Sequence, residues 1–303
     1  MVADSVISAK RCSAVVPPSL SPRGNVYIVY NCIQCPFSRL VAAACCIACR
    51  CTAAVGAMSS GFEILWDTID LVQCITLRDR PERRAAAAAQ FAAVGLSDRV
   101  EFLLQERDVE DGKRGCFVAH QAAAEIALDR GARIALTFED DVEFMAHFTP
   151  HVAARAAAFL RQGNGLEWDI FFLGHFPRRM VLTSAPDIVQ VRSMDAHAYV
   201  LSSNGMRDLC SQKYAGEQVD AQYHYGCAAA FALYPMVALQ TPGPSDTEGL
   251  RRADDWNDDK LRREQELYKG CVERKALSHA LGVSQEELAA MGVLSGVQAL
   301  QSG

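Results

Sequence analysis

The sequence predicts an α/β fold built around a mostly parallel, Rossmann-like sheet. Apolar runs of strand length at 71–77, 99–104 and 133–138 alternate with segments of helix length. Such alternation is typical of a parallel sheet, because each helix carries the chain back to the edge where the next strand starts. The chain has 303 residues and is 50% apolar, so it can bury a large core.

The first strand-loop-helix unit opens with the apolar, β-branched run LVQCITL. In the basic loop that follows, Asp79 is expected to cap the next helix and Pro81 to occupy its first turn. Gly95 is expected to end that helix, because glycine accepts the backbone conformation that follows a helix end. RVEFLL at 99–104 predicts the second strand, and the amphipathic run at 115–131 predicts a helix that leads into the third.

The second half of the chain predicts a change to antiparallel strands. A helix over 148–162 and a strand over 168–174 complete the alternating part. Shorter elements follow, with β segments and then a helix predicted at 178–184, 188–193, 196–203 and 203–213. Beyond residue 250 the sequence is charged and helical, and Ser284 with Glu287 has the spacing of a capping box. We therefore expect an antiparallel half followed by a helical tail.

Three adjacent carboxylates follow the apolar strand at 133–138. Like charges packed side by side raise one another's pKa, so Glu139, Asp140 and Asp141 call for a cation. Glu139 and Asp141 share one side of an extended chain, and their hard oxygen atoms suit Mg²⁺ or Mn²⁺ better than Zn²⁺. Ligands of open α/β sheets gather at the carboxyl ends of strands. The triplet thus predicts a metal that holds a diphosphate, and a solvated acidic turn is the alternative.

The overall charge argues against a nucleic-acid partner. The net charge is −6 and the pI about 5.7, so no general field attracts phosphates or an anionic membrane. The tail segment KALSHALGVSQEELAAMG is similar to the first two helices of a helix-turn-helix reader, but it has no basic face. We therefore favour a helical hairpin that packs on the domain over a DNA-binding or interaction role for the tail.

Composition divides the chain into three parts. Residues 1–57 form a cysteine- and alanine-rich segment, 58–249 the main domain and 250–303 a helical extension. The first segment is expected to lie outside the folded domain, either disordered or untranslated if translation starts at Met58. Seven of the 12 cysteines fall in the first 51 residues, and the sparse remainder is typical of a reduced compartment. A cytoplasmic location is therefore expected.

The apolar run at 40–58 is the candidate for contact with a membrane. Arg50 would cost about 2.5 kcal/mol or more at the centre of a span, and the alanines around it contribute little. We therefore predict no membrane span, while membrane association through the N-terminal segment stays open.

Four sequence blocks, in order and with regular spacing, suggest a family. They are CITLRDRPERR, GCFVAH, LTFEDDVEF and WDIFFLG. With them, residues 71–248 resemble glycosyltransferase family 25, which includes bacterial lipo-oligosaccharide galactosyltransferases and collagen galactosyltransferases. The resemblance implies a GT-A domain over 58–249 with an antiparallel acceptor-side half. It also implies a UDP-hexose donor, usually UDP-galactose, a Mn²⁺ or Mg²⁺ cofactor, and inverting transfer to a hydroxyl group of a glycan, lipo-oligosaccharide or protein.

The resemblance also implies roles for individual residues. The basic loop of the family lies by the nucleotide, which makes Arg80 and Arg83 candidates for contact with it and Asp79 a candidate for the base or ribose. Asp140 would hold the ribose or shape the turn. His120 is expected to be a buried helix residue rather than a ligand. The chain departs from the family at Ala119, where a serine is usual, and lacks a tryptophan shortly after it.

An inverting transfer needs a base that takes the proton of the acceptor, and carboxylates usually carry this role. Asp220, in QVDAQY, ranks first because it matches an aspartate of the family, and Asp246 ranks second. A metal-dependent nucleotidyl or phosphoryl transferase would use the same acidic triplet, but neither GxGxxG nor GxxxxGK[ST] occurs. A catalytically inactive relative that keeps the fold is the other alternative.

Because the composition changes so sharply near residue 57, a chain that begins at Met58 should be soluble and keep its melting temperature. The region before Leu71 supplies no predicted strand to the sheet. Thermal unfolding of the two proteins followed by circular dichroism checks this expectation, and an insoluble or unfolded shorter chain would contradict it.

Overall fold

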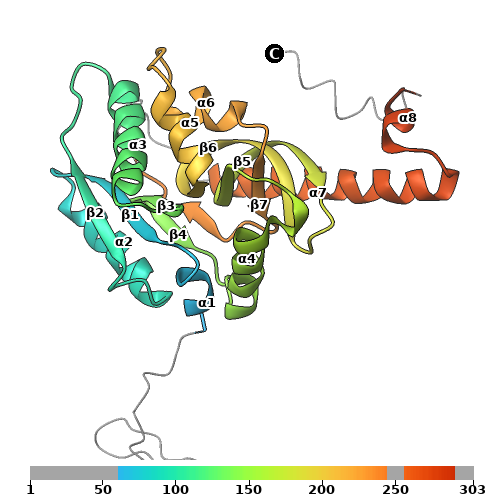
Figure 1. The fold of residues 1–303 in the computed structure, drawn as a ribbon, viewed down its shortest axis with the longest axis horizontal. Helices are drawn as coiled ribbons and strands as arrows, with labels where there is room; N and C mark the ends of the chain where they lie inside the picture. The colour runs from blue at the N-terminus through green and yellow to red at the C-terminus, as the bar shows by residue number, and fades with distance from the viewer. Residues whose placement is uncertain (1–60, 244–255, 291–303) are drawn as a thin grey trace, which may run out of the picture. The chain divides into compact units, whose positions relative to one another are not determined.

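The computed structural model describes residues 61–243 and 256–290 (Figure 1). Their centre is a six-stranded sheet in the order β2-β1-β3-β6-β5-β7. These strands are β1 Leu71–Leu77, β2 Val100–Gln105, β3 Ile134–Glu139, β5 Ile170–Leu182, β6 Ile188–Ser202 and β7 Ala230–Leu233. A separate pair joins β4, Val142–Phe144, to β8, Ala238–Gln240.

Strand β6 runs against its neighbours, and the other strands of this sheet share one direction. β1 is parallel to both β2 and β3, and β5 is parallel to β7. β6 pairs antiparallel with β3, β5 and β7. The predicted class, an α/β fold with a mostly parallel sheet, antiparallel pairing in its second half and a helical tail, is therefore confirmed. The arrangement is consistent with the GT-A type.

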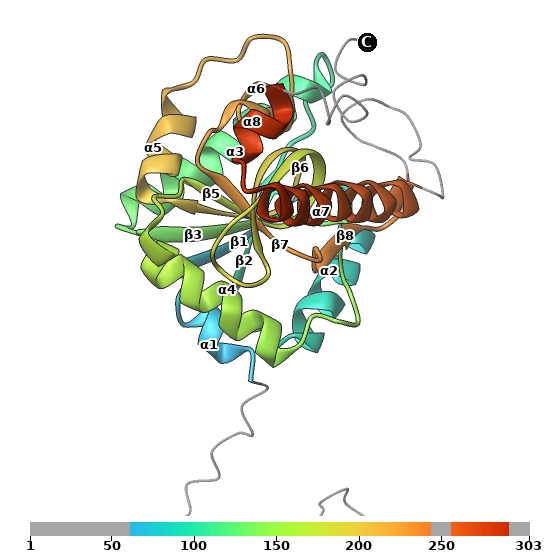
Figure 2. The ribbon, with the colours of Figure 1, turned by 90° about the vertical axis from the view of Figure 1, so that its right-hand side faces the viewer.

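Helices cover both faces of the sheet (Figure 2). The helices are α1 Glu63–Trp66, α2 Pro81–Ala93, α3 Gly112–Asp129, α4 Pro150–Gln162, α5 Ser203–Ser211, α6 Val219–Gln222, α7 Trp256–Leu281 and α8 Gln285–Ala290, with 3₁₀ turns at Gly163–Gly165 and His224–Gly226. Core residues of α1, α2 and α4 pack on one face, and those of α3, α5, α6 and α7 on the other.

The sheet separates these two cores because side chains of a strand alternate between its faces. In β6, Ala198 and Val200 belong to the core under α4, whereas Tyr199 and Leu201 belong to the core under α3. This alternation fixes which polar side chains of β6 can reach which face. Tyr199 is consequently available to helix α3, where the functional site described below lies.

Two predictions about the strands were wrong in the same way. The segments 168–174 and 178–184 form one strand, β5, and the segments 188–193 and 196–203 form one strand, β6. Register shifts near Gly174 and Pro177, and a positive φ of 73° at Asp195, let the long strands bend without ending. Gly174, Pro177 and Asp195 are of types that usually end a strand, but here they form irregularities within one.

The predicted helix starts were partly wrong. Arg80, not Asp79, is the N-cap residue of α2, and no side chain caps it, although Pro81 opens the helix as predicted. Helix α3 starts at Gly112, earlier than predicted, because the carboxylate of Asp111 accepts hydrogen bonds from two backbone N–H groups of its first turn. The capping box of α8 is confirmed: Ser284 and Glu287 exchange hydrogen bonds of 2.7 and 3.1 Å.

Helix α7 is tied to the sheet by charges that are completely buried. Lys260 is 0% exposed, and its Nζ lies 2.5 Å from Oδ2 of Asp195 and 2.7 Å from Oε1 of Gln240. One turn later Glu264, 1% exposed, accepts a 2.9 Å hydrogen bond from the backbone N–H of Met236. A buried lysine is stable only when it is paired and hydrogen-bonded, so these contacts fix the position of α7.

Among the helices in the described ranges, none is both long and apolar enough to cross a membrane. The segment 1–57 lies outside these ranges, and the division of the chain at residues 57 and 249 stays a prediction.

Replacing Lys260 with methionine should lower the free energy of unfolding by about 3 to 5 kcal/mol. The substitution keeps the length of the side chain but takes the buried lysine cation away from the Asp195 carboxylate, which is only 13% exposed. The control is Lys269→Met on the same helix, where the lysine is exposed and 3.8 Å from an exposed Glu273, and it should leave stability unchanged. Urea denaturation measures both, and equal midpoints for the two variants would contradict the assigned role of Lys260.

Candidate functional site

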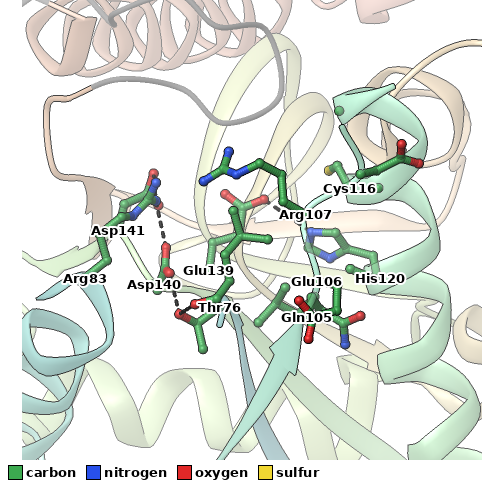
Figure 3. A pocket seen from close by; sticks show the side chains of 16 residues that line it. Thr76, Arg83, Gln105, Glu106, Arg107, Cys116, His120, Glu139, Asp140 and Asp141 are labelled. Carbon is green, nitrogen blue, oxygen red and sulfur yellow. Dashed lines mark hydrogen bonds and ion pairs between the residues drawn. The ribbon is translucent and has the colours of Figure 1, made fainter. Parts of the chain in front are cut away.

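A cleft opens at the carboxyl ends of β1 and β3, beside the first turns of α3 (Figure 3). The parallel pairing of β1 with β3 brings these two strand ends to one edge of the sheet. The cleft is lined by the end of β1, the loop after β2, one side of α3 and the acidic triplet. Its polar lining comprises Thr76, Arg83, Gln105, Glu106, Arg107, Asp108, Cys116, His120, Glu139, Asp140 and Asp141.

Asp140 and Asp141 form the turn between β3 and β4, and Arg83 of α2 holds both. Nη2 of Arg83 lies 2.7 Å from Oδ1 of Asp140 and 3.1 Å from Oδ2 of Asp141. Thr76, at the end of β1, donates a 2.6 Å hydrogen bond to the other oxygen of Asp140. Both aspartates are buried, at 7% and 6% exposure, so the alternative of a solvated acidic turn is wrong.

Burial decides the protonation of Asp140. It raises the pKa of Asp140 to about 6, although Arg83 and the hydrogen bond from Thr76 act in the opposite direction and the neighbouring carboxylates add to the rise. The arginine and the threonine therefore offset only part of the cost of burying this charge. The site therefore still favours the binding of a further cation or of a proton.

Glu139 turns away from the two aspartates, toward α3. Its Oε1 lies 3.2 Å from Nε2 of His120, and its Oε2 accepts a 3.4 Å hydrogen bond from Gln240 of β8. Figure 3 shows the same division, with Glu139 beside His120 and with Asp140 and Asp141 beside Arg83. The prediction that Glu139 and Asp141 share one side of an extended chain is wrong, because the chain turns at Asp140 and the two residues have different neighbours.

A divalent metal fits this edge by the chemistry of its donors. Glu139 and Asp141 both present carboxylate oxygens to the cleft, and oxygen is the ligand that Mg²⁺ and Mn²⁺ prefer. Cys116, His120 and Glu139 offer a second, mixed set of donor atoms, all within 4.8 Å of one another. His120 is buried as predicted, at 1% exposure, yet it lines the cleft.

Of the basic-loop residues that were predicted to contact the nucleotide, only one lies in the cleft. Arg83 lines it, whereas Arg80 lies 3.6 Å from Glu82 and is not part of the lining. Asp79 pairs with Arg107 at 3.1 Å, and Arg107 is itself a lining residue. Arg107 was not predicted; it is the second residue after β2 and could have been found as a polar residue near a strand end.

The two candidates for the catalytic base have different outcomes. Asp220, in α6, is 7% exposed and accepts a 3.0 Å hydrogen bond from the backbone N–H of Asp195. It does not line the cleft, and burial raises its pKa to about 6, with a further rise from the charge of Asp195. Asp246 lies outside the described residues.

A chain of polar contacts joins Glu139 to Asp220, and its last link is the backbone N–H of Asp195. It runs from Glu139 through Gln240 to Lys260, and from Lys260 through Asp195 to Asp220. Lys260 was not predicted, but its spacing along α7 could have indicated it. The buried face of this helix is formed by Lys260, Glu264, Leu267 and Cys271. A lysine and a glutamate at apolar positions of a helix indicate buried pairing.

Helix α3 supplies the opposite wall of the cleft. Its residue His120 is held by Tyr199, which in turn packs against His224. Nδ1 of His120 lies 2.8 Å from the hydroxyl of Tyr199, and the ring of Tyr199 packs edge-on against His224 at a centroid distance of 4.4 Å. Burial lowers the pKa of His224 to about 3, so that ring is neutral at pH 7. The aromatic packing behind α3 therefore adds no charge to the cleft.

No family model matches the chain. A cow protein named "Probable inactive glycosyltransferase 25 family member 3" is 26% identical over 179 residues, covering 50% of this chain and 30% of that protein. The human "Inactive glycosyltransferase 25 family member 3" is 25% identical over 241 residues, covering 63% of this chain and 40% of that protein. The chain thus spans less than half the length of the curated relatives it matches here.

A crystal structure of UDP-glucose pyrophosphorylase complexed with UDP-glucose overlaps with this fold at a TM-score of 0.37, with 10% identity over 70% of this chain and 86% of that one. The overlap is partial, and the fold assignment rests on the sheet topology described above. The resemblance to glycosyltransferase family 25 that the sequence blocks indicated is confirmed by relatives that carry the name of that family.

Proposed function

We propose that the cleft at the carboxyl ends of β1 and β3 binds a UDP-sugar, and that the protein transfers its hexose to a hydroxyl group. The observation that carries the proposal is the acidic turn, where two buried aspartates face a cleft with one arginine between them. A buried cluster of this kind is costly to the fold, which favours a role at the site over a structural one. The relatives named for a glycosyltransferase family support the reaction class.

The donor would be held from two sides. Arg83 would face the diphosphate, and Asp140 would contact the ribose. Arg80 and Asp79 lie outside the lining of the cleft, so they would contact the diphosphate and the base or ribose only where the nucleotide extends beyond it. Glu139 and Asp141 would hold Mn²⁺ or Mg²⁺. The bound metal supplies positive charge to the diphosphate, whose negative charge grows as the glycosidic bond breaks. Thr76 and Arg83 hold the Asp140 carboxylate in place before any ligand arrives.

Galactose is the hexose that the resemblance favours, and a glycan, lipo-oligosaccharide or protein hydroxyl is the acceptor class. Transfer with inversion needs a base, for which Asp220 ranks above Asp246. A pKa of about 6 would let Asp220 take a proton near neutral pH. Its carboxylate does not line the cleft and is connected to Glu139 only through Asp195, Lys260 and Gln240, so it would act after a rearrangement of this wall.

A second candidate is a donor-binding protein that does not turn over. Arg83 already balances part of the charge of Asp140 and Asp141, which weakens the attraction for a metal, and the curated relatives carry the word "inactive" in their names. This candidate shares the binding site with the first and differs only in turnover. Assays of binding and of donor hydrolysis, carried out together, separate the two.

Replacing Asp141 with asparagine should abolish coupled binding of Mn²⁺ and UDP and lower donor turnover by on the order of a hundredfold or more. The swap keeps the size of the side chain but removes a charge that would balance the metal. The fold should survive, because Arg83 stays paired with Asp140 at 2.7 Å and the repulsion between neighbouring carboxylates falls. Calorimetry with Mn²⁺ and UDP measures the binding, and a screen of UDP-sugars for metal-dependent hydrolysis measures turnover.

The control for this experiment is Asp259→Asn, on the half-exposed face of α7, where the carboxylate pairs only with Arg262 of its own helix in the contacts described. It should bind and turn over like the wild type. Coupled binding of equal strength in Asp141→Asn and wild type would overturn the proposed site. Coupled binding in the wild type without hydrolysis of any UDP-sugar would select the inactive candidate.

Stability should depend on pH through Asp220. Its pKa in the folded protein is about 6, above the ordinary value of 3.8, so the folded state binds the proton more tightly than the unfolded state. The free energy of unfolding should therefore fall as the pH rises from about 4 to about 6. In Asp220→Asn this part of the slope should vanish. Urea denaturation at several pH values without metal tests it, and parallel curves for the two proteins would contradict it.

A further inference from the structure

Three side chains of different chemistry converge on the α3 wall of the cleft. The sulfur of Cys116, a ring nitrogen of His120 and a carboxylate oxygen of Glu139 all lie within 4.8 Å of one another. Cys116 and His120 are four residues apart on α3, which puts them on one face of the helix. Glu139 comes from the end of β3, so the cluster joins two elements that are distant in the sequence.

The imidazole of His120 is held by a partner on the ring nitrogen that faces away from the cluster, as in metal sites. Its Nδ1 lies 2.8 Å from the hydroxyl of Tyr199, and its Nε2 faces Oε1 of Glu139 at 3.2 Å. Histidines that bind metals almost always have such a partner on the second nitrogen, because it fixes the tautomer and the plane of the ring. Tyr199 is itself buried between α3 and the sheet, so this orientation is rigid.

Glu139 is oriented in the same way. Gln240 donates to its Oε2, and Lys260 in turn donates to the side-chain oxygen of Gln240 at 2.7 Å. That chain of contacts leaves Oε1 turned toward His120 and Cys116. Two of the three donor groups are therefore held by partners outside the cluster, which is the arrangement that favours metal binding over a loose group of polar side chains.

We propose that Cys116, His120 and Glu139 bind a zinc-class divalent ion on the α3 wall, with a fourth position open to the cleft. A thiolate, an imidazole and a carboxylate are the three ligand types of zinc sites, and three protein ligands with one open position are typical of catalytic ones. Mg²⁺ and Ca²⁺ prefer oxygen alone. Ion binding places the negative thiolate in the site and releases the thiol proton of Cys116 to solvent.

The distances agree with this assignment. Bond lengths of about 2.0 to 2.3 Å put the ligand atoms of a tetrahedral zinc roughly 3 to 4 Å apart. The 3.2 Å between His120 and Glu139 already lies in that range, and the cysteine sulfur, within 4.8 Å, needs only a small approach. The open position faces the same cleft as Arg83 and Asp141, where a water or a phosphate oxygen would complete the coordination.

This site shares Glu139 with the oxygen-only pair of Glu139 and Asp141 but does not use Asp141, and it needs no nucleotide. Its test is a titration of the full chain with Co²⁺, which replaces zinc and gives a thiolate-to-metal absorption band when a cysteine binds it. Cysteines of residues 1–57 contribute equally to all variants, so the result is the difference between each variant and the wild type. Cys116→Ser should lose part of the thiolate band, and Glu139→Gln should weaken Co²⁺ binding at this site about tenfold or more.

Two controls separate this site from its alternatives. Cys210→Ser alters a cysteine outside the cleft lining and should leave the spectrum unchanged. Asp141→Asn should also leave the cobalt spectrum unchanged even where it abolishes binding of Mn²⁺ with UDP, so failure of the donor site and failure of this one are distinguishable. Circular dichroism confirms that each variant is folded.

Equal thiolate bands in the wild type and in a folded Cys116→Ser variant would overturn the proposal. In that case His120 and Glu139 form only a hydrogen-bonded pair. The same conclusion follows if Glu139→Gln, which keeps the shape and the hydrogen bond from Gln240, binds Co²⁺ as tightly as the wild type does.

Discussion

The structure depends on balancing several carboxylates that are buried around the end of β3. Asp140 and Asp141 are each less than 10% exposed and pair with Arg83 of α2, while Asp195, at 13% exposure, pairs with Lys260 of α7. An unbalanced charge in a protein interior costs several kcal/mol, so the helices that carry these cations cannot be placed freely. The positions of α2 and α7 therefore both follow from the need to place a cation beside a carboxylate that is shielded from solvent.

Lys260 has the larger structural effect of the two cations. It connects α7 to β6 through Asp195 and to β8 through Gln240, and Gln240 is the residue that also contacts Glu139. A helix near the C-terminus thereby reaches the cleft without lining it. A change in the packing of α7 would alter the contacts of Lys260 with Asp195 and Gln240 first, and through Gln240 it would reach the Glu139 carboxylate, two hydrogen bonds away.

The parts of the fold that the sequence predicted are those with local signals. The strands β1, β2 and β3 are continuous apolar runs, and Pro81, Gly95 and the capping box of α8 are signals contained within a few residues. The length of β5 and β6 was missed, because whether Gly174 and Asp195 end a strand depends on neighbouring strands. The same holds for the site. The acidic triplet was visible, whereas its division between Arg83 and His120 depends on contacts between residues far apart in the sequence.

Thr76 gives the cleft a property that a purely donating side chain would not. Its hydroxyl lies 2.6 Å from Asp140, and a hydroxyl both donates and accepts hydrogen bonds by rotating about one bond. When Asp140 is ionised, the hydroxyl donates to it; when Asp140 carries a proton, the hydroxyl can accept that proton's hydrogen bond and donate instead toward the carbonyl of Leu77, 3.4 Å away. The contact between Thr76 and Asp140 can thus persist in both charge states of the aspartate, so a positively charged ligand that changes the protonation of Asp140 need not break it.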